Sequence, residues 1–291
     1  DNVGVTAYQI ERCAGATCTS FAQIATATTT TYGDSGLAAS TTYRYRVRAM
    51  DAAGNLSPYS NIASATTQAP PPPPPGGLVA AYGFSEGTGT TTADATGKGH
   101  TGTLQGGASW TTSGKYGSGL SFNGSTAYVD LGNAADLQLT GSMTWSAWIY
   151  ATSNPPDDGQ IIAKSGGAGW QFKTTPDTGQ HTFGVGVSAD AGSLTQRYST
   201  TVRALGTWYH VAGVYDATAR TLDLYVNGVL DNGVLSGMVP ASQYNAAENV
   251  TVGRRAGGFY FAGTIDEVRL YNRALSQAEI QADMNAPLGG P

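Results

Sequence analysis

The stretch that decides the fold is Gly206–Gly228, with the sequence GTWYHVAGVYDATARTLDLYVNG. Its residues alternate between two faces through Tyr209–Tyr215 and again through Leu222–Val226, which is the period of two expected of strands with one buried face. Between them, Asp216–Arg220 is small and polar, as a hairpin loop should be, and Asn227–Gly228 is a strong tight-turn dipeptide. The stretch therefore predicts two strands and a turn within a β-sheet.

The composition extends this prediction to the whole chain. Only 12% of the 291 residues are charged, 40 are glycine, and long helical patterns are absent. Low charge, frequent glycine and many short alternating runs favour an all-β protein with many turns. The formal net charge of −5 argues against nucleic acid or an anionic membrane as a partner. No apolar run approaches the roughly 20 residues that a membrane helix needs, so no membrane span is expected.

A proline run divides the chain. Residues 69–77 read APPPPPPGG, and six consecutive prolines favour a semi-rigid polyproline II spacer that ends in a glycine joint. We expect one domain over residues 1–68, a linker over 69–77 and a second domain over 78–286. We interpret the proline run as a passive tether rather than as a ligand for a proline-binding domain.

The two cysteines, Cys13 and Cys18, are separated by only four residues. No histidine or further cysteine lies nearby to complete a zinc site. The two sulfur atoms flank a turn that contains glycine. They either close a small disulfide across a hairpin, which would favour an oxidising compartment, or remain two reduced surface thiols.

The first domain resembles part of a fibronectin type III sandwich. The resemblance rests on Leu37 with Thr42–Val47, TYRYRV, which matches the corner between strands E and F, and it makes Tyr43 the corner tyrosine that bonds back to the backbone. Such sandwiches take ~100 residues, and here the first two strands are missing. Either the chain was cut from a longer protein, or another subunit donates the missing strands.

The second domain resembles a laminin-G-like, concanavalin A-like lectin jelly roll across Gly77–Asn285. Six phrases occur in the order typical of that family: Leu78–Phe84, Asp94–Gly102, Leu120–Gly124 with Tyr128–Asp130, Met143–Ile149, Gly206–Gly228 and Gly263–Tyr271. The expected fold is all-β: a partial immunoglobulin-like sandwich, a proline linker and a jelly-roll β-sandwich. The tail Ser276–Met284 predicts a short helix that begins with a capping box between Ser276 and Glu279.

The resemblance also implies a structural calcium ion. In related jelly rolls, calcium often joins the early glycine-rich loop to an aspartate of the last strand. This implies Asp94 and Asp266 as side-chain ligands, with main-chain carbonyls from Gly97 and His100. Lys98 stands where many relatives have asparagine, which weakens the case if its side chain turns inward. The alternative is a loop held by hydrogen bonds alone.

A second acidic loop lies at Asn154–Gly159, NPPDDG. Its Asp157 and Asp158 could bind a second calcium ion. Solvated loop charge is the preferred interpretation.

Ligand binding is predicted from residues that suit a sugar, because aromatic rings stack on its C–H faces and planar polar groups satisfy its hydroxyls. Arg254 and Arg255 precede Phe259 and Tyr260 in one flexible loop, a pairing able to hold a carboxylated sugar. Ordinary packing is the competing interpretation for every candidate. The candidate exposed residues are Trp170, His181, Arg197, Tyr198, Arg254, Arg255, Phe259 and Tyr260.

Catalysis is not predicted. Hydrolases of this superfold commonly carry their carboxylates as E-x-D-x-x-E on one strand, and none of the glutamates stands in that pattern. Asp266 and Glu267 are adjacent, so on a strand they face opposite sides. The histidines have no serine-centred elbow beside them. We expect no enzymatic activity from this chain.

The sequence therefore predicts a secreted or cell-surface recognition module that binds a glycan or another extracellular ligand. This step rests on analogy with the family, because fold does not dictate function. One alternative is a structural subunit of an extracellular assembly, which binds copies of itself or a neighbouring domain of a longer chain. Another is a targeting appendage of a larger secreted glycoside hydrolase.

Overall fold

The computed structural model describes residues 4–38, 40–67 and 76–288. The chain divides into two compact units, residues 1–71 and 72–291. Most of the expected linker, residues 69–75, lies outside the described residues.

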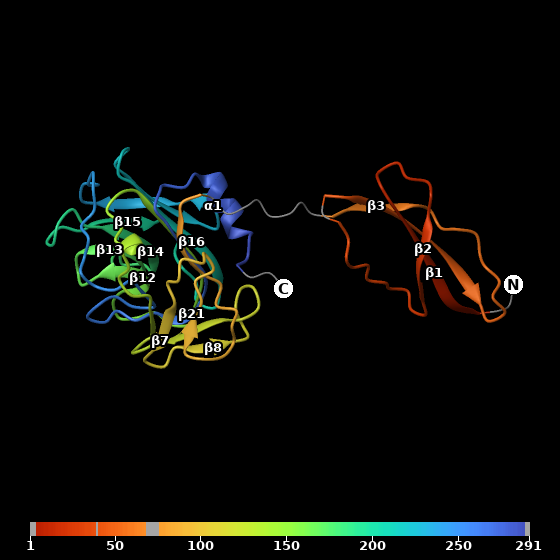
Figure 1. The fold of residues 1–291 in the computed structure, drawn as a ribbon, viewed down its shortest axis with the longest axis horizontal. Helices are drawn as coiled ribbons and strands as arrows, with labels where there is room; N and C mark the ends of the chain where they lie inside the picture. Colours follow the sequence, from red (N-terminus) through yellow and green to blue (C-terminus); the bar gives the residue numbers. More distant parts are fainter. Residues whose placement is uncertain (1–3, 39, 68–75, 289–291) are drawn as a thin grey trace. The chain divides into compact units, whose positions relative to one another are not determined.

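Unit 1 is built on one antiparallel sheet (Figure 1). Among its described residues the strand order is β2-β1-β3-β4. The strands are β1 (Val5–Ala14), β2 (Ala22–Ala27), β3 (Thr42–Asp51) and β4 (Ala63–Thr66). Cys13 and Cys18 are joined by a disulfide at the end of β1, and the Tyr43 hydroxyl accepts a hydrogen bond from the main-chain N–H of Ala38.

The two faces of this sheet differ in chemistry. On one face Arg46 of β3 donates to Glu11 of β1 at 2.6 and 2.8 Å, and its guanidinium lies 3.7 Å from the ring centre of Tyr59. On the other face Ile10 pairs with Val47 in register. Alternation along β1 and β3 thus separates a charged face from a mostly apolar face, which also carries the ion pair between Arg12 and Asp34.

The described residues of unit 2 form two antiparallel sheets packed face to face (Figure 1). The nine-stranded sheet has the order β19 (Asn232–Ser236), β15 (Thr195–Ser199), β14 (Thr182–Val187), β13 (Gly169–Thr175), β12 (Gly159–Ser165), β20 (Thr251–Val252), β10 (Tyr128–Asp130), β7 (Gly102–Gln105) and β6 (Thr91–Thr92). The eight-stranded sheet has the order β18 (Val229–Leu230), β17 (Thr221–Val226), β16 (Trp208–Asp216), β11 (Met143–Ala151), β21 (Ala262–Tyr271), β9 (Gly119–Asn123) and β8 (Ser109–Thr111), and β5 (Leu78–Tyr82) pairs with β21.

The hairpin expected at Gly206–Gly228 is present as β16 and β17, with Gly213 opposite Leu224. The core lies between the two sheets, and Trp145, Phe172 and Leu224 are fully buried there. The expected all-β jelly-roll sandwich is confirmed.

The described part of unit 2 also contains two short helices, η1 (Ala135–Leu137) and α1 (Gln277–Met284). The predicted capping box between Ser276 and Glu279 is present at the start of α1. Ile280 of α1 packs with Ala212 and Val214 on the outer face of the eight-stranded sheet. Among the described residues, no helix is long and apolar enough to cross a membrane.

A buried charge cluster lies on this outer face beneath α1. Arg269 contacts Glu267 at 2.7 Å and Asp283 at 3.2 Å, and the exposed fraction of each side chain is at most 2%. Glu267 has a φ of 55° and is the extra residue of a β-bulge. The expectation that Asp266 and Glu267 face opposite sides was therefore wrong, because the bulge turns Glu267 to the same outer face as Arg269.

This cluster predicts a pH dependence of stability. Burial raises the pKa of Glu267 to about 7 and that of Asp266 to about 6. Between about pH 4.5 and 7 these two carboxyl groups bind more protons in the folded state than in the unfolded state, so their contribution to the free energy of unfolding falls as pH rises. We expect this contribution to fall by about 1–3 kcal/mol between pH 5 and 7.5. Buried His210, whose pKa burial lowers to about 3, contributes in the opposite sense below about pH 6.5, so the contribution of Glu267 is measured against a variant.

Denaturant unfolding followed by tryptophan fluorescence measures this loss in unit 2, because all five tryptophans lie there. Glu267→Gln should remove the fall that Glu267 contributes, so its free energy of unfolding should decrease less, or increase more, between pH 5 and 7.5 than that of wild type. Glu86→Gln, at an exposed glutamate, should leave the dependence unchanged. Equal slopes in the wild-type and Glu267→Gln proteins would contradict the assignment.

Candidate functional site

The face of the nine-stranded sheet that is turned away from the core is polar. In β13, Trp170 and Phe172 enter the core, so Gln171 and Lys173 between them face the other way. Their register partners in β14 are Gly186 and Gly184. We use the name polar face for the side chains of Gln160, Gln171, Lys173, Gln196 and Tyr198, of which Gln196 is half-buried and the others are buried.

An ion-pair network lies at one end of the polar face. Lys173 Nζ lies 2.9 Å from Asp158 Oδ2 and 2.7 Å from Asp177 Oδ2. The Tyr198 hydroxyl donates to Asp177 Oδ2 at 3.0 Å. Burial would raise the pKa of the Asp177 carboxyl, but the Lys173 hydrogen bond and charge lower it. For Asp158, burial outweighs Lys173 and the pKa is raised.

Several buried polar atoms beside this network have no hydrogen-bond partner within the part of the chain that the structure describes. They are Asp158 Oδ1, Gln160 Oε1 and Arg255 Nε, whereas Arg254 Nε, also without a partner, belongs to a guanidinium that lies over Tyr128 of β10. Buried polar groups are normally paired, so two acceptors and one donor without partners suit a ligand whose groups both donate and accept.

The segment between β20 and β21 carries two stacked arginines. Arg254 lies 3.4 Å from the ring centre of Tyr128, and Arg255 lies 3.6 Å from that of Phe259. Arg255 and Gly258 form a tight bridge, and the Phe259 carbonyl accepts from the main-chain N–H of Gln160. The loop is therefore anchored to β12 beside the polar face. We call Gly253–Tyr260 the arginine loop.

The structure places the predicted ligand residues in three different settings. Arg254, Arg255, Phe259 and Tyr260 come together in the arginine loop, each half-buried. Tyr198 lies on the polar face with 8% of its surface exposed. His181 is half-buried and precedes β14.

The expectation that Trp170, Arg197 and Tyr198 lie in loops was wrong, because their segments are strands β13 and β15. Trp170 is a core residue, 1% exposed and packed edge to face on Trp145, because its segment is strand β13 and not a loop. Arg197 donates to the main-chain carbonyls of Leu222 and Gly233 at 2.9 Å, so it links strands.

The polar-face residues Gln160, Gln171, Lys173 and Gln196 were missed by sequence reasoning. Their signal is the alternation in Gly169–Thr175, GWQFKTT, where polar residues occupy every second position. That pattern reveals a polar face but does not say which other strands contribute to it.

The residues expected to hold calcium bind different segments. Asp94 accepts hydrogen bonds from the main-chain N–H groups of Ala81 and Thr96. Asp266 accepts from those of Lys115 and Tyr116. The carbonyl of His100 accepts from the Tyr82 hydroxyl, and Gly97 takes a φ of 76° within the turn.

Calcium requires lone pairs that face the ion, whereas these carboxylates face N–H donors. The arrangement of Asp94 and Asp266 does not fit a shared calcium ion. It favours the alternative, in which the glycine-rich loop is held by hydrogen bonds alone.

Replacement of Asp94 tests this. Asp94→Ala leaves its N–H donors without their acceptor, so the free energy of unfolding should fall by about 2 kcal/mol. This decrease in the free energy of unfolding should be the same in calcium and in EDTA. Denaturant unfolding followed by tryptophan fluorescence measures it. A difference that disappears in EDTA would restore calcium to this loop.

Comparison with known proteins identifies the superfamily to which the chain belongs. Residues 123–281 match the family Laminin_G_3, described as the concanavalin A-like lectin/glucanases superfamily. Because the match covers more than half of the sequence, the chain belongs to this superfamily. No curated protein matches the chain.

Several solved structures share the fold. Domain 4 of AbnA, a GH43 extracellular arabinanase from Geobacillus stearothermophilus solved with arabinotriose, is 21% identical with a TM-score of 0.56, over 72% of this chain and 98% of that one. The binding domain of Paraclostridial Mosquitocidal Protein 1 is 14% identical with a TM-score of 0.56, over 72% and 52%. The binding domain of botulinum neurotoxin DC, solved with rat synaptotagmin II, is 12% identical with a TM-score of 0.55, over 72% and 51%. This chain thus spans about half the length of these two toxin domains, and identities this low establish the fold alone.

Proposed function

We propose that unit 2 is a non-catalytic carbohydrate-binding module of an extracellular protein, and that the arginine loop and the end of the polar face beside exposed Asp157 and Asp177 form its binding surface. The observation that carries the proposal is the Arg255–Phe259 stack beside the unpartnered atoms of Asp158 and Gln160. A sugar ring stacks on an aromatic face, and each hydroxyl both donates and accepts a hydrogen bond.

We favour a neutral sugar over the carboxylated sugar that the two arginines suggest. One carboxyl oxygen from each of Asp157, Asp158 and Asp177 lies within 4.8 Å of the other two. An anionic ligand would meet this negative charge on the polar face. Both arginines are already stacked on aromatic rings, where a guanidinium still offers edge N–H groups to hydroxyls.

The carboxylates do not favour hydrolysis. Glycosidases need one protonated and one ionised carboxyl group. Here the Lys173 ammonium bridges one oxygen of Asp158 and one of Asp177, so it occupies the position between the two carboxyl groups where the scissile bond would have to lie. A binding role therefore suits this cluster better than catalysis.

The proposal extends to the setting of the module. The Cys13–Cys18 disulfide suits an oxidising compartment, and domain 4 of AbnA belongs to an extracellular arabinanase. A module of this kind could direct a larger secreted hydrolase to its polysaccharide. We keep the proposals that unit 1 is a partial fibronectin type III domain and that the proline run is a spacer.

Binding to a panel of neutral oligosaccharides tests the proposal, with arabinotriose as the first probe because the AbnA domain was solved with it. Arg255→Ala and Phe259→Ala should each weaken binding about tenfold in calorimetry, because each removes half of the stack. The matched controls Arg220→Ala and Tyr244→Ala, at exposed residues outside the arginine loop, should bind as wild type. Unchanged affinity in both loop variants would place the site elsewhere.

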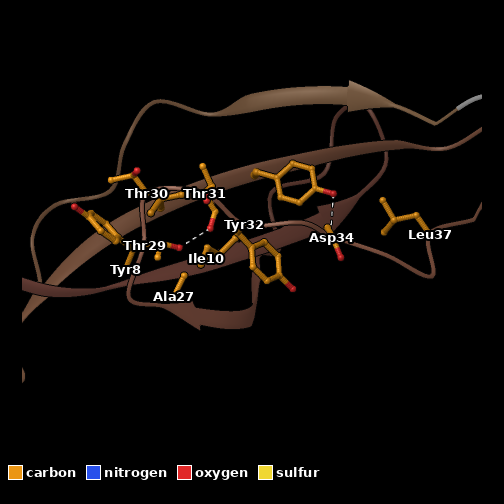
Figure 2. Close-up of a pocket in the computed structure, with 11 residues that line it drawn as sticks. Tyr8, Ile10, Ala27, Thr29, Thr30, Thr31, Tyr32, Asp34 and Leu37 are labelled. Carbon is orange, nitrogen blue, oxygen red and sulfur yellow. Dashed lines mark hydrogen bonds between the residues drawn. The ribbon is translucent and has the colours of Figure 1, made fainter.

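A second candidate function is assembly through unit 1. The apolar face of its sheet borders a pocket of about 610 Å³, lined by Tyr8, Ile10, Tyr32, Leu37, Tyr45 and Val47 among others (Figure 2). A strand from a neighbouring copy could fill such a face.

Light scattering over a range of concentrations separates the two functions. We expect the mass of one chain, because the chain's own segment with Tyr32, Asp34 and Leu37 already borders the pocket, and the Tyr45 hydroxyl bonds to Asp34 at 2.8 Å. A discrete oligomer would favour assembly. Val47→Lys, within the pocket, should then dissociate it, whereas Val5→Lys, at an exposed residue outside the pocket, should not.

A further inference from the structure

The geometry points to an oxyanion-binding site at Arg203 of unit 2, which takes the carboxylate or sulfate group of a ligand. Arg203 follows β15, and only 5% of its surface is exposed. Its Nη2 group donates to the side-chain oxygen of Asn154 at 2.7 Å. Nε and Nη1 have no partner within the part of the chain that the structure describes. The N–H groups of these two nitrogens, on a buried cation, are therefore without an acceptor.

The charge of Arg203 also lacks a counterion. No carboxylate of the described residues forms an ion pair with it, and the side-chain hydrogen bond that it makes goes to a neutral amide. Buried Arg269 and Lys173, by contrast, each contact two carboxylates. Burial lowers the pKa of the Arg203 guanidinium, and Tyr209 offsets this effect only in part. An unpaired buried charge is costly, and a bound anion would supply the missing partner.

The shape of the guanidinium selects the class of ligand. Its N–H groups form two edges, each with a parallel pair, and Nη2 belongs to both edges. The Asn154 oxygen uses one N–H of Nη2 and contacts neither Nε nor Nη1. One edge therefore keeps both of its N–H groups, which is the arrangement that binds two oxygens of a carboxylate or of a tetrahedral oxyanion. A neutral sugar hydroxyl would leave the charge unpaired.

The guanidinium lies just beneath the surface, because Asn154, which it contacts, is exposed. Ala204, the next residue along the chain, is exposed as well. The main-chain carbonyl of half-buried His181 accepts from the Arg203 N–H at 2.6 Å, so the main chains of these two residues are neighbours. His181, predicted from the sequence as a ligand residue, therefore lies next to Arg203 in the main chain. An anion can reach Arg203 from solvent between these segments.

The site is separate from the polar face and from the arginine loop. The main-chain N–H of Ala204 donates to the Tyr209 hydroxyl at 3.2 Å, and the Tyr209 ring packs edge to face on Phe183 in the core. Arg203 therefore lies beside one end of the core, whereas the ion-pair network of Lys173 lies on the outer face of the sheet. The carboxylates that disfavour an anion on the polar face do not contact Arg203. The inference is thus independent of the proposed function.

Calorimetric titration of the full chain tests the site, with sodium sulfate and sodium galacturonate as probes at constant ionic strength. We expect one sulfate ion per chain in wild type and about tenfold weaker binding in Arg203→Lys, which keeps the charge but loses the planar fork. Arg203-dependent binding of galacturonate that is tighter than that of sulfate would identify an acidic sugar as the source of the anion. Binding of sulfate that is equal or tighter would identify a free anion.

Asn154→Asp gives a second test that remains informative if Arg203→Lys fails to fold by circular dichroism. Asn154 is exposed, and an aspartate in its place puts a carboxylate beside the guanidinium. This internal partner should weaken the binding of both anions about tenfold, because it competes for the same N–H groups. It should also raise the midpoint of denaturant unfolding, because the buried charge is then paired.

Two control variants locate the anion. Arg220→Lys, at an exposed arginine, and Arg255→Ala, in the arginine loop, should both bind sulfate as wild type. The inference is overturned if wild type binds neither anion, if Asn154→Asp binds both as tightly as wild type, or if Arg255→Ala abolishes sulfate binding. Because sulfate has no sugar ring to stack, its titration does not depend on the proposed carbohydrate site.

Discussion

The edge-to-face packing of Trp145 against Trp170 is the contact on which the rest of unit 2 depends. The two rings come from different sheets, and their centres lie 5.9 Å apart in the core. Because successive residues of a strand face opposite sides, burying Trp170 and Phe172 sends Gln171 and Lys173 to the other face. A slip of one residue would reverse this arrangement and bury the lysine in the core. Core packing therefore positions the polar face.

Each sheet of unit 2 carries a cluster of buried charge on its outer face, and the two clusters differ in what covers them. On the eight-stranded sheet, α1 and the segment after it cover Arg269, whose partners Glu267 and Asp283 are themselves buried. On the nine-stranded sheet, Lys173 is paired as well, but Asp177 reaches solvent. Burial of charge requires pairing in both places. Only the second cluster leaves acceptors without partners beside an accessible surface, which makes it the better candidate for a ligand.

In unit 1, residues of the same chain cover part of each face of an amphipathic sheet. Its charged face is closed by Arg46, Glu11 and Tyr59, which contact one another. Its apolar face is covered in part by the segment that contains Tyr32, and a pocket remains beside it (Figure 2). A sheet normally buries its apolar face against a second layer. The apolar face of unit 1 therefore suggests assembly, whereas recognition is proposed for unit 2, so the two hypotheses concern different units.

The sequence by itself determined the features that depend on local order along the chain. Alternation and turn residues define the hairpin of β16 and β17, and the spacing of Ser276 and Glu279 defines the capping box of α1. The arginine loop could also be recognised, because Arg254, Arg255, Phe259 and Tyr260 are close in sequence. Local order is sufficient in these cases because each interaction spans only a few residues.

Only the tertiary structure decided which residues share a face. Period two assigns Trp170 and Lys173 to opposite sides of a strand but does not say which side is covered. The bulge at Glu267 shifts the register by one residue, which no alternation pattern reveals. Asp158, Lys173 and Asp177 meet because β12 and β13 pair in one register and the flanking loops fold over the same end. Such contacts depend on strand pairing and layer packing, which a single sequence does not specify.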